Sequence, residues 1–379
     1  MPRQTLPPAA AVDDEGIDAV AHAMVTRAER PAADEPERPM LLCGTGITLL
    51  NLALSGDAAG GWAVGKMYNV VGDKSTGKTL MALSALAEAA HNPAFDSYGL
   101  YHDDAEAACE FAVAKLFGRR LADRLRPPPR GEASHTIEDW RASILQLLDA
   151  GEPFIYVLDS FDSLTTREEV DLVNEHVRAD LAGTKQKGTY GMARAKINSQ
   201  LFRIITSRLA ATRSILLIIS QTRQSINAGP FEPQTYRAGG AALDFYSSGV
   251  IWLNVRETLR RETARYIVGQ RVNAKIEKNK LTGRRGVVSF CYLYDYGLDD
   301  VRACIDWLVE AGVWTKTGQG RITPRGAGSL ERIGVGTADQ LAKRIDAARA
   351  LPALRRVTAA AWAALMERLK PEGRTPRYV

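Results

Sequence analysis

The stretch from Gly72 to Leu80 holds the residue types and spacing that could most directly do chemistry. A glycine stands at each end of its loop, and a lysine and a threonine follow the second glycine, which is the pattern of a phosphate-binding loop. Glycines allow backbone N–H groups to turn toward an anion, and a helix that begins there adds positive potential. We expect a nucleotide to be held by Gly72, Asp73, Lys74, Ser75, Thr76, Gly77, Lys78, Thr79 and Leu80. Lys78 could reach the β- and γ-phosphates, and the Thr79 hydroxyl could hold Mg²⁺.

The segments on either side of this loop decide whether the pattern is a chance match. Residues 67–71 are typical of a short buried strand, and residues 80–90 are rich in strong helix formers. A phosphate-binding loop needs a strand before it and a helix after it, so the context favours function over coincidence.

A carboxylate follows another buried strand. Residues 154–158 form a continuous apolar run, which is typical of a strand in a parallel sheet, and Asp159 comes directly after it. A carboxylate in that place can hold Mg²⁺ through water, although many such residues only make a turn. The preceding phosphate loop favours the functional interpretation, so we expect Thr79 and Asp159 to form the metal site.

An acidic patch follows a further predicted strand at residues 98–101. A carboxylate near the γ-phosphate could act as the general base that activates the attacking water. Asp103, Asp104 and Glu106 all qualify by composition, and spacing alone does not choose among them.

Two basic stretches could contact nucleic acid. Residues 183–190 contain lysines, glycines and an aromatic side chain but no acid, and residues 222–238 form a long predicted loop with a single acid. Basic loops that carry aromatics suit a phosphate backbone and unstacked bases. The candidate DNA contacts are Lys185, Lys187, Tyr190, Arg223, Phe231, Tyr236 and Arg237. Composition supports equally well the alternative that both are ordinary surface loops.

Alternating strands and helices must position these residues. Further strands are expected at 214–219, 250–255 and 287–294, and helices at 107–119, 137–150 and 191–211. A hairpin is expected around Gly269 and Gln270. This alternation predicts an α/β fold with a mostly parallel, doubly wound sheet, whose site lies at the carboxyl ends of the strands.

The chain divides into three predicted parts. Residues 1–40 form an N-terminal arm and linker, in which residues 14–30 carry an apolar stripe at helical spacing. This helical arm could dock on a neighbouring subunit, or it could be a frayed tail. Residues 41–298 form the core, and residues 299–379 form a small helical or α/β accessory domain that could touch duplex DNA or serve only packing.

Composition limits the classes of protein that fit. The 379 residues carry a net charge of +5, which is compatible with an anionic partner but also with an ordinary solvated surface. Four scattered cysteines indicate buried thiols in a reducing compartment rather than a zinc site or a disulfide framework. The sequence shows neither an apolar signal core nor an apolar run long enough for a membrane span, so we expect a cytoplasmic protein.

Taken in order, the motifs resemble those of RecA-type recombinases, from about Cys43 to about Trp314. The resemblance is carried by residues 43–54, 72–79, 104–106, 157–160, 219–223, 239–246 and 278–280. It implies a RecA-like P-loop ATPase core that uses ATP and Mg²⁺. It also implies a DNA-dependent ATPase that forms homo-oligomeric helical filaments on single-stranded DNA. Such a protein would promote homologous pairing and strand exchange with double-stranded DNA, in recombination and repair.

The resemblance also implies roles for single residues. Glu106 falls on the water-activating residue, and Gln221 falls on the residue that senses the γ-phosphate. The two basic stretches fall on the DNA-binding loops, and Gly239 and Gly240 close the second of them. Lys278 and Lys280 match lysines that reach across a subunit interface to the ATP of the neighbour. Without the resemblance, a solvated strand end is the simpler interpretation of either lysine.

Departures from the family pattern leave other functions to weigh. The part before Leu41 shows no match, Asp244 stands where a basic residue is common, and the C-terminus is basic rather than acidic. These departures indicate a divergent member, of the kind that a phage or a mobile element could encode. One alternative is a ring-forming helicase or regulatory ATPase on the same core. Another is a DNA-binding regulator that does not hydrolyse ATP.

Overall fold

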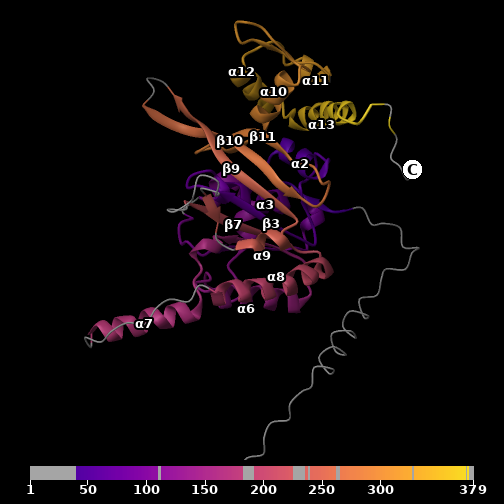
Figure 1. Ribbon diagram of the computed structural model, residues 1–379. Helices are drawn as coiled ribbons and strands as arrows, with labels where there is room; N and C mark the ends of the chain where they lie inside the picture. Colours follow the sequence, from indigo (N-terminus) through magenta and orange to yellow (C-terminus); the bar gives the residue numbers. More distant parts are fainter. Residues whose placement is uncertain are drawn as a thin grey trace, which may run out of the picture. The chain divides into compact units, whose positions relative to one another are not determined.

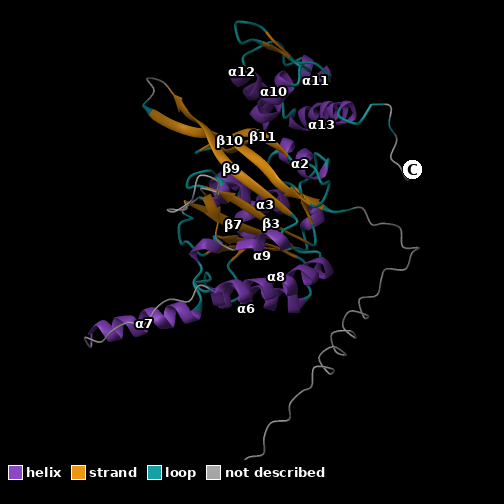
Figure 2. Cartoon of the chain, viewed as in Figure 1, coloured by secondary structure: helices purple, strands orange, loops and turns teal. Residues whose placement is uncertain are grey.

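One large mixed sheet forms the centre of the fold (Figure 2). In the part of the chain that the structure describes, its order is β12-β11-β10-β9-β3-β7-β6-β4-β5, and β8 pairs with β7 beside this path. The strands are β3 (Lys66–Gly72), β4 (Gly99–Asp104), β5 (Leu125–Arg126), β6 (Phe154–Asp159), β7 (Ile215–Gln224), β8 (Thr235–Arg237), β9 (Gly249–Arg261), β10 (Tyr266–Asn279), β11 (Gly286–Leu293) and β12 (Gly297–Asp299). Neighbours from β9 to β5 run parallel, and those from β9 to β12 run antiparallel. The predicted mostly parallel α/β sheet is confirmed.

The computed structural model describes residues 40–109, 112–181, 192–224, 235–237, 240–261, 265–326, 328–372 and 374. Residues 41–379 belong to one compact unit. The arm predicted over residues 1–40 lies outside the described residues, apart from Met40.

Helices cover both faces of the sheet, because its central strands are apolar on both sides (Figure 1). Along β7, Leu217 and Ile219 belong to the core that contains α3, whereas Leu216 and Ile218 belong to the core that contains α6 and α8. The helices are α2 (Thr48–Ser55), α3 (Lys78–His91), α4 (Val113–Phe117), α5 (Arg119–Arg124), α6 (Ile137–Ala150), α7 (Arg167–Leu181), α8 (Met192–Thr212), α9 (Gly240–Tyr246), α10 (Asp300–Glu310), α11 (Gly328–Glu331), α12 (Ala338–Ala347) and α13 (Leu351–Arg368).

The predicted helix over residues 107–119 is wrong. The structure has a turn there, followed by the short helices α4 and α5, which are separated by Gly118 at φ 85°. The carboxylate of Asp104 accepts the backbone N–H groups of Ala108 and Cys109, and this turn replaces the first helical residues.

The predicted hairpin at Gly269 and Gln270 is also wrong. Both residues lie inside β10, and the long hairpin is instead formed by β9 and β10. A Cβ on Gly269 would lie 2.1 Å from the carbonyl oxygen of Tyr292, so the glycine permits a close approach of β11 rather than a turn.

The predicted loop over residues 222–238 is shorter than expected. Strand β7 continues to Gln224 and pairs antiparallel with β8, so that Thr222 faces Arg237 and Arg223 faces Tyr236. Residues 225–234 lie outside the described residues. Residues 223, 236 and 237, which are basic or aromatic, therefore belong to two paired strands rather than to a loop.

The C-terminal residues have a core of their own. Side chains of α10, α12 and α13 pack around Trp314 and Ile322, and the short strands β13 (Thr315–Lys316) and β14 (Ile322–Thr323) pair beside them. The carboxylate of Asp300 ties this part to α2, because it accepts the backbone N–H of Thr48 at 2.7 Å and the hydroxyl of Thr48 at 2.8 Å. The strands β1 (Leu42–Cys43) and β2 (Trp62–Ala63) form a further small pair near α2. Within the described residues, the helices are too short or too polar to cross a membrane.

Candidate active site

The loop between β3 and α3 has the backbone that its glycines allow. A Cβ on Gly72 would lie 2.7 Å from the carbonyl oxygen of Leu253, so no other residue fits there without a shift. Gly77 has φ 83° and would place a Cβ 3.0 Å from the ring of Tyr292. The loop therefore turns tightly, and the N-terminus of α3 faces the cleft, where an anion is favoured.

Lys78 supplies a buried positive charge at this helix N-terminus. Its residue is only 8 % exposed, and Nζ donates a hydrogen bond to the carbonyl oxygen of Asp73 at 2.6 Å. Burial lowers the pKa of Lys78, whereas nearby carboxylates, Asp159 and Glu106 first, act in the opposite direction. A bound phosphate would add negative charge beside this ammonium and would further favour its protonated form.

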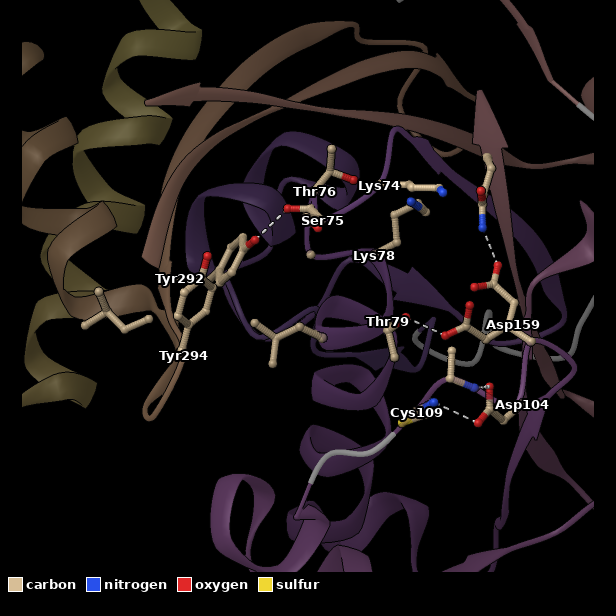
Figure 3. Close-up of a pocket in the computed structure, with 16 residues that line it drawn as sticks. Lys74, Ser75, Thr76, Lys78, Thr79, Asp104, Cys109, Asp159, Tyr292 and Tyr294 are labelled. Atoms are coloured by element: carbon tan, nitrogen blue, oxygen red, sulfur yellow. Dashed lines mark hydrogen bonds between the residues drawn. The ribbon is translucent and has the colours of Figure 1, made fainter. Parts of the chain in front are cut away.

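Thr79 and Asp159 lie together at the floor of the cleft (Figure 3). The Thr79 hydroxyl donates to Oδ2 of Asp159 at 2.6 Å, and Asp159 is buried at the end of β6. A hydroxyl and a carboxylate are hard oxygen ligands of the kind that Mg²⁺ binds alongside water and substrate phosphates. The pair predicted from the sequence is thus assembled in a form that fits this ion.

The structure separates the three acidic candidates. Asp103 is fully buried, where it accepts hydrogen bonds from Ser134 and, at 2.5 Å, from the hydroxyl of Tyr156. Burial and the neighbouring Asp103 raise the pKa of Tyr156, so its hydroxyl stays protonated and donates. Asp104 caps the turn that follows β4. Glu106 and Asp104 both line the cleft, but among the described residues the carboxylate of Glu106 accepts hydrogen bonds from side chains and not from a turn of the backbone, so Glu106 stays the stronger candidate to accept a proton.

Two side-chain donors hold Glu106. Oε1 accepts the hydroxyl of Ser160 at 2.5 Å and also the amide Nε2 of Gln221. The backbone N–H of Gln221 donates in turn to Oδ2 of Asp162 at 2.7 Å. Gln221 therefore bonds both to Asp162, which follows β6, and to Glu106, which follows β4, and is in direct contact with the candidate base.

Thr222 joins the same strand end to the phosphate loop. Its hydroxyl donates to the carboxylate of Asp73. The sequence interpretation missed Ser160, Asp162 and Thr222, although each directly or closely follows a residue that it named at a strand end. Their position after buried strands was one signal, and Ser160 and Thr222 also lie in the stretches 157–160 and 219–223 that carry the family resemblance.

Tyr292 of β11 and Tyr294, which directly follows that strand, line the wall of the cleft opposite Asp159, and the cleft has a volume of about 680 Å³. The hydroxyl of Tyr292 donates to the carbonyl oxygen of Ser75 at 2.6 Å and lies 3.0 Å from Oε1 of Gln270. Burial raises the pKa of Tyr292 to about 12, so this donor stays protonated at neutral pH. Tyr294 lines the same wall (Figure 3). Sequence reasoning missed both tyrosines, because β11 is far from the phosphate loop along the chain.

Comparison with known proteins places this cleft in a family. The RecA N-terminal domain family matches residues 32–299, which include every residue that lines the cleft. The chain belongs to the RecA family. Protein RecA of Arthrobacter sp. (strain FB24) is 32% identical over 289 residues, which cover 75% of this chain and 74% of the relative. Protein RecA of Corynebacterium urealyticum is 30% identical over 286 residues, covering 75% of this chain and 70% of the relative.

In this RecA-family chain, Lys278 and Lys280 do not reach the cleft of their own subunit. Lys278 donates to the carbonyl oxygens of Asp244 and Phe245 at the end of α9, and Lys280 donates to that of Phe245 at 3.1 Å. Phe245 is 68% exposed, and the ammonium of Lys280 lies 5.9 Å from the centre of its ring. The two lysines and Phe245 thus lie together beside the C-terminus of α9.

The expected DNA contacts are described only in part. Lys185, Lys187, Tyr190, Phe231 and Gly239 lie outside the described residues. Arg223 belongs to β7, Tyr236 and Arg237 belong to β8, and Gly240 begins α9. The path of the main chain brings these positions to the strand end that carries Gln221.

The carboxylates Glu106 and Asp104 lead to different expectations for ATP hydrolysis. We expect Glu106→Gln to lower turnover by about 10²–10⁴-fold, because an amide cannot take a proton from water. Asp104→Asn should stay within about threefold of the unmodified protein, because its amide oxygen can still accept the backbone N–H of Cys109, which makes the shorter of the two hydrogen bonds of the turn. Phosphate release and binding of a fluorescent ATP analogue are measured for both variants. A greater loss in Asp104→Asn would assign the role to Asp104 instead.

Proposed function

We propose that this protein is a DNA-dependent ATPase that forms filaments on single-stranded DNA and promotes homologous pairing and strand exchange in recombination and repair. The observation that carries the proposal is a pair of hydrogen-bonded links at the end of β7. Gln221 contacts Glu106, and the next residue, Thr222, contacts Asp73 of the phosphate loop. The candidate base, the phosphate loop and the chain leading to a predicted DNA-binding segment thus meet at one strand end.

The cleft would bind ATP with Mg²⁺, as its phosphate loop and the RecA-family motifs imply. Lys78 and the backbone N–H groups of the loop would hold the phosphates, while Thr79 and Asp159 would hold the ion. When bound, Mg²⁺ would neutralise phosphate charge during transfer. Glu106 would then take the proton of the attacking water.

The link through Gln221 would let the nucleotide state control DNA binding. A γ-phosphate beside Glu106 would offer the Gln221 amide a new acceptor, and a resulting shift at the end of β7 would act on the predicted DNA-binding segment that follows. Lys185, Lys187, Tyr190, Arg223, Phe231, Tyr236, Arg237, Gly239 and Gly240 are the proposed DNA-binding residues. The switch belongs to the class in which a γ-phosphate orders a segment and its hydrolysis releases it.

A complete site would need a second copy of the chain. Lys278 and Lys280 are held beside α9, away from their own cleft, so the only ATP that they could serve is that of a neighbour in an assembly. Cations at a developing phosphoryl charge act as arginine fingers do. The proposal therefore includes a homo-oligomer, with residues 41–298 as its ATPase core, residues 1–40 as an arm and residues 299–379 as an accessory domain, acting in the cytoplasm.

The architecture of the assembly distinguishes this function from its competitors. We expect helical filaments by electron microscopy when the protein is mixed with single-stranded DNA and a non-hydrolysable ATP analogue. ATP hydrolysis should also rise about tenfold or more with single-stranded DNA, since DNA binding and nucleotide state are coupled. Closed rings would favour a helicase or regulatory ATPase, and absence of hydrolysis with and without DNA would favour a non-hydrolysing regulator.

Mixed assemblies test whether Lys280 acts on a neighbour. Lys280→Ala and Glu106→Ala should each lose most DNA-stimulated turnover alone. In a mixture, some interfaces combine an intact Glu106 with an intact Lys280 from the adjacent subunit, so activity should return to about a quarter of the unmodified level for random mixing. Lys275→Ala, an exposed position nearby on β10, serves as the control for substitution of a lysine. A mixture no more active than its two components would refute the role across the interface.

A further inference from the structure

A buried histidine lies beside the carboxylate that would hold Mg²⁺. The side chain of His102 is only 9 % exposed, and its Nε2 is fully buried and has no hydrogen-bond partner among the residues that the structure describes. Buried polar atoms in native proteins almost always have a partner, so an exception calls for a reason. His102 does not line the cleft, and none of the site chemistry above uses it.

The sheet register explains how this imidazole comes to face Asp159. Strands β4 and β6 run parallel, with His102 opposite Val157 and Asp104 opposite Asp159. Side chains two residues apart along a strand share a face, so His102 and Asp159 both point to the side of the sheet that packs on α3. The distance from Nε2 of His102 to Oδ2 of Asp159 is 3.9 Å, which is longer than a hydrogen bond.

The same carboxylate oxygen is the acceptor for Thr79, at 2.6 Å. A carboxylate oxygen has lone pairs for more than one donor, so Oδ2 can accept Thr79 and His102 together. A small shift of the carboxylate toward β4 would satisfy the orphaned Nε2–H and fix the plane of the carboxyl group. Side chains that bind a metal ion are commonly oriented by hydrogen bonds from residues that do not themselves touch the ion.

We infer that His102 is a positioning residue, whose Nε2–H group orients the Asp159 carboxylate for Mg²⁺ in the nucleotide complex. The inference rests on the proposed function, because Asp159 is a metal ligand only under that proposal. His102 would be the second side chain, after Thr79, that holds the Asp159 carboxylate. It requires no change in the charge of His102 and no contact between His102 and the ion. A histidine that only fills space would be replaceable by any side chain of similar shape.

Three substitutions separate orientation from packing. His102→Phe keeps the ring shape but removes the donor, and His102→Asn keeps an amide that is too short to present N–H where Nε2 lies. His102→Gln places an amide N–H close to the position of Nε2. His135→Phe, at an exposed histidine outside the cleft, is the matched control.

Mg²⁺ is titrated into each variant with a fluorescent, non-hydrolysable ATP analogue, and binding of the analogue is also measured with EDTA. We expect the Mg²⁺ concentration for half-saturation to rise about tenfold or more in His102→Phe and His102→Asn. His102→Gln and the control should stay within about threefold, and affinity in EDTA should be unchanged throughout. Thermal unfolding checks the fold, and the Asn–Gln pair decides the matter if the Phe variant does not fold.

An unchanged Mg²⁺ dependence in His102→Asn, or equal losses in the Asn and Gln variants, would overturn the inference while leaving the proposed function standing. Failure of the unmodified protein to bind the analogue in a Mg²⁺-dependent way would overturn both.

Discussion

The parallel register of β3, β7, β6 and β4 is the constraint on which the site depends. It pairs Gly72 with Gln221 and Asp104 with Asp159, so that the strands end at one level. Strand β7 is buried on both faces as far as Ile219, and a one-residue slip would turn each of its side chains to the wrong core. Packing of the sheet thus determines which polar groups at the strand ends come within hydrogen-bonding distance of one another.

Hydrogen bonds at that edge link the end of β7 to both the candidate base and the phosphate loop. Gln221 and Thr222 are adjacent on one strand, yet one contacts Glu106 and the other contacts Asp73. Because β7 is buried below this point, the proposed switch would pass a change at either contact beyond Gln224 rather than into the core. Tyr292 donates a hydrogen bond to the phosphate loop from the other wall of the cleft.

The sequence predicted the parts of the site that depend on local pattern. The phosphate loop, the buried strand before Asp159 and the mostly parallel sheet follow from short motifs and apolar runs. Local pattern left Glu106 and Asp104 open, and only the family resemblance favoured Glu106. The structure supports Glu106 as the candidate, because the carboxylate of Asp104 accepts backbone N–H groups of the turn after β4. Tyr292 was also hidden, since its role comes from antiparallel strands that extend the sheet. Gly269 was misinterpreted as a turn because the close approach of β11 has no local signal.

The affinity for single-stranded DNA, compared between nucleotide states, tests the central claim most directly. Fluorescence anisotropy of a labelled oligonucleotide should show about tenfold or tighter binding with a non-hydrolysable ATP analogue than with ADP. Gln221→Met, which keeps the size but removes the amide, should bind DNA with similar affinity in both states and should match the ADP state of the unmodified protein. If Gln221→Met retains the full gain with the ATP analogue, the link from the nucleotide to DNA does not run through Gln221.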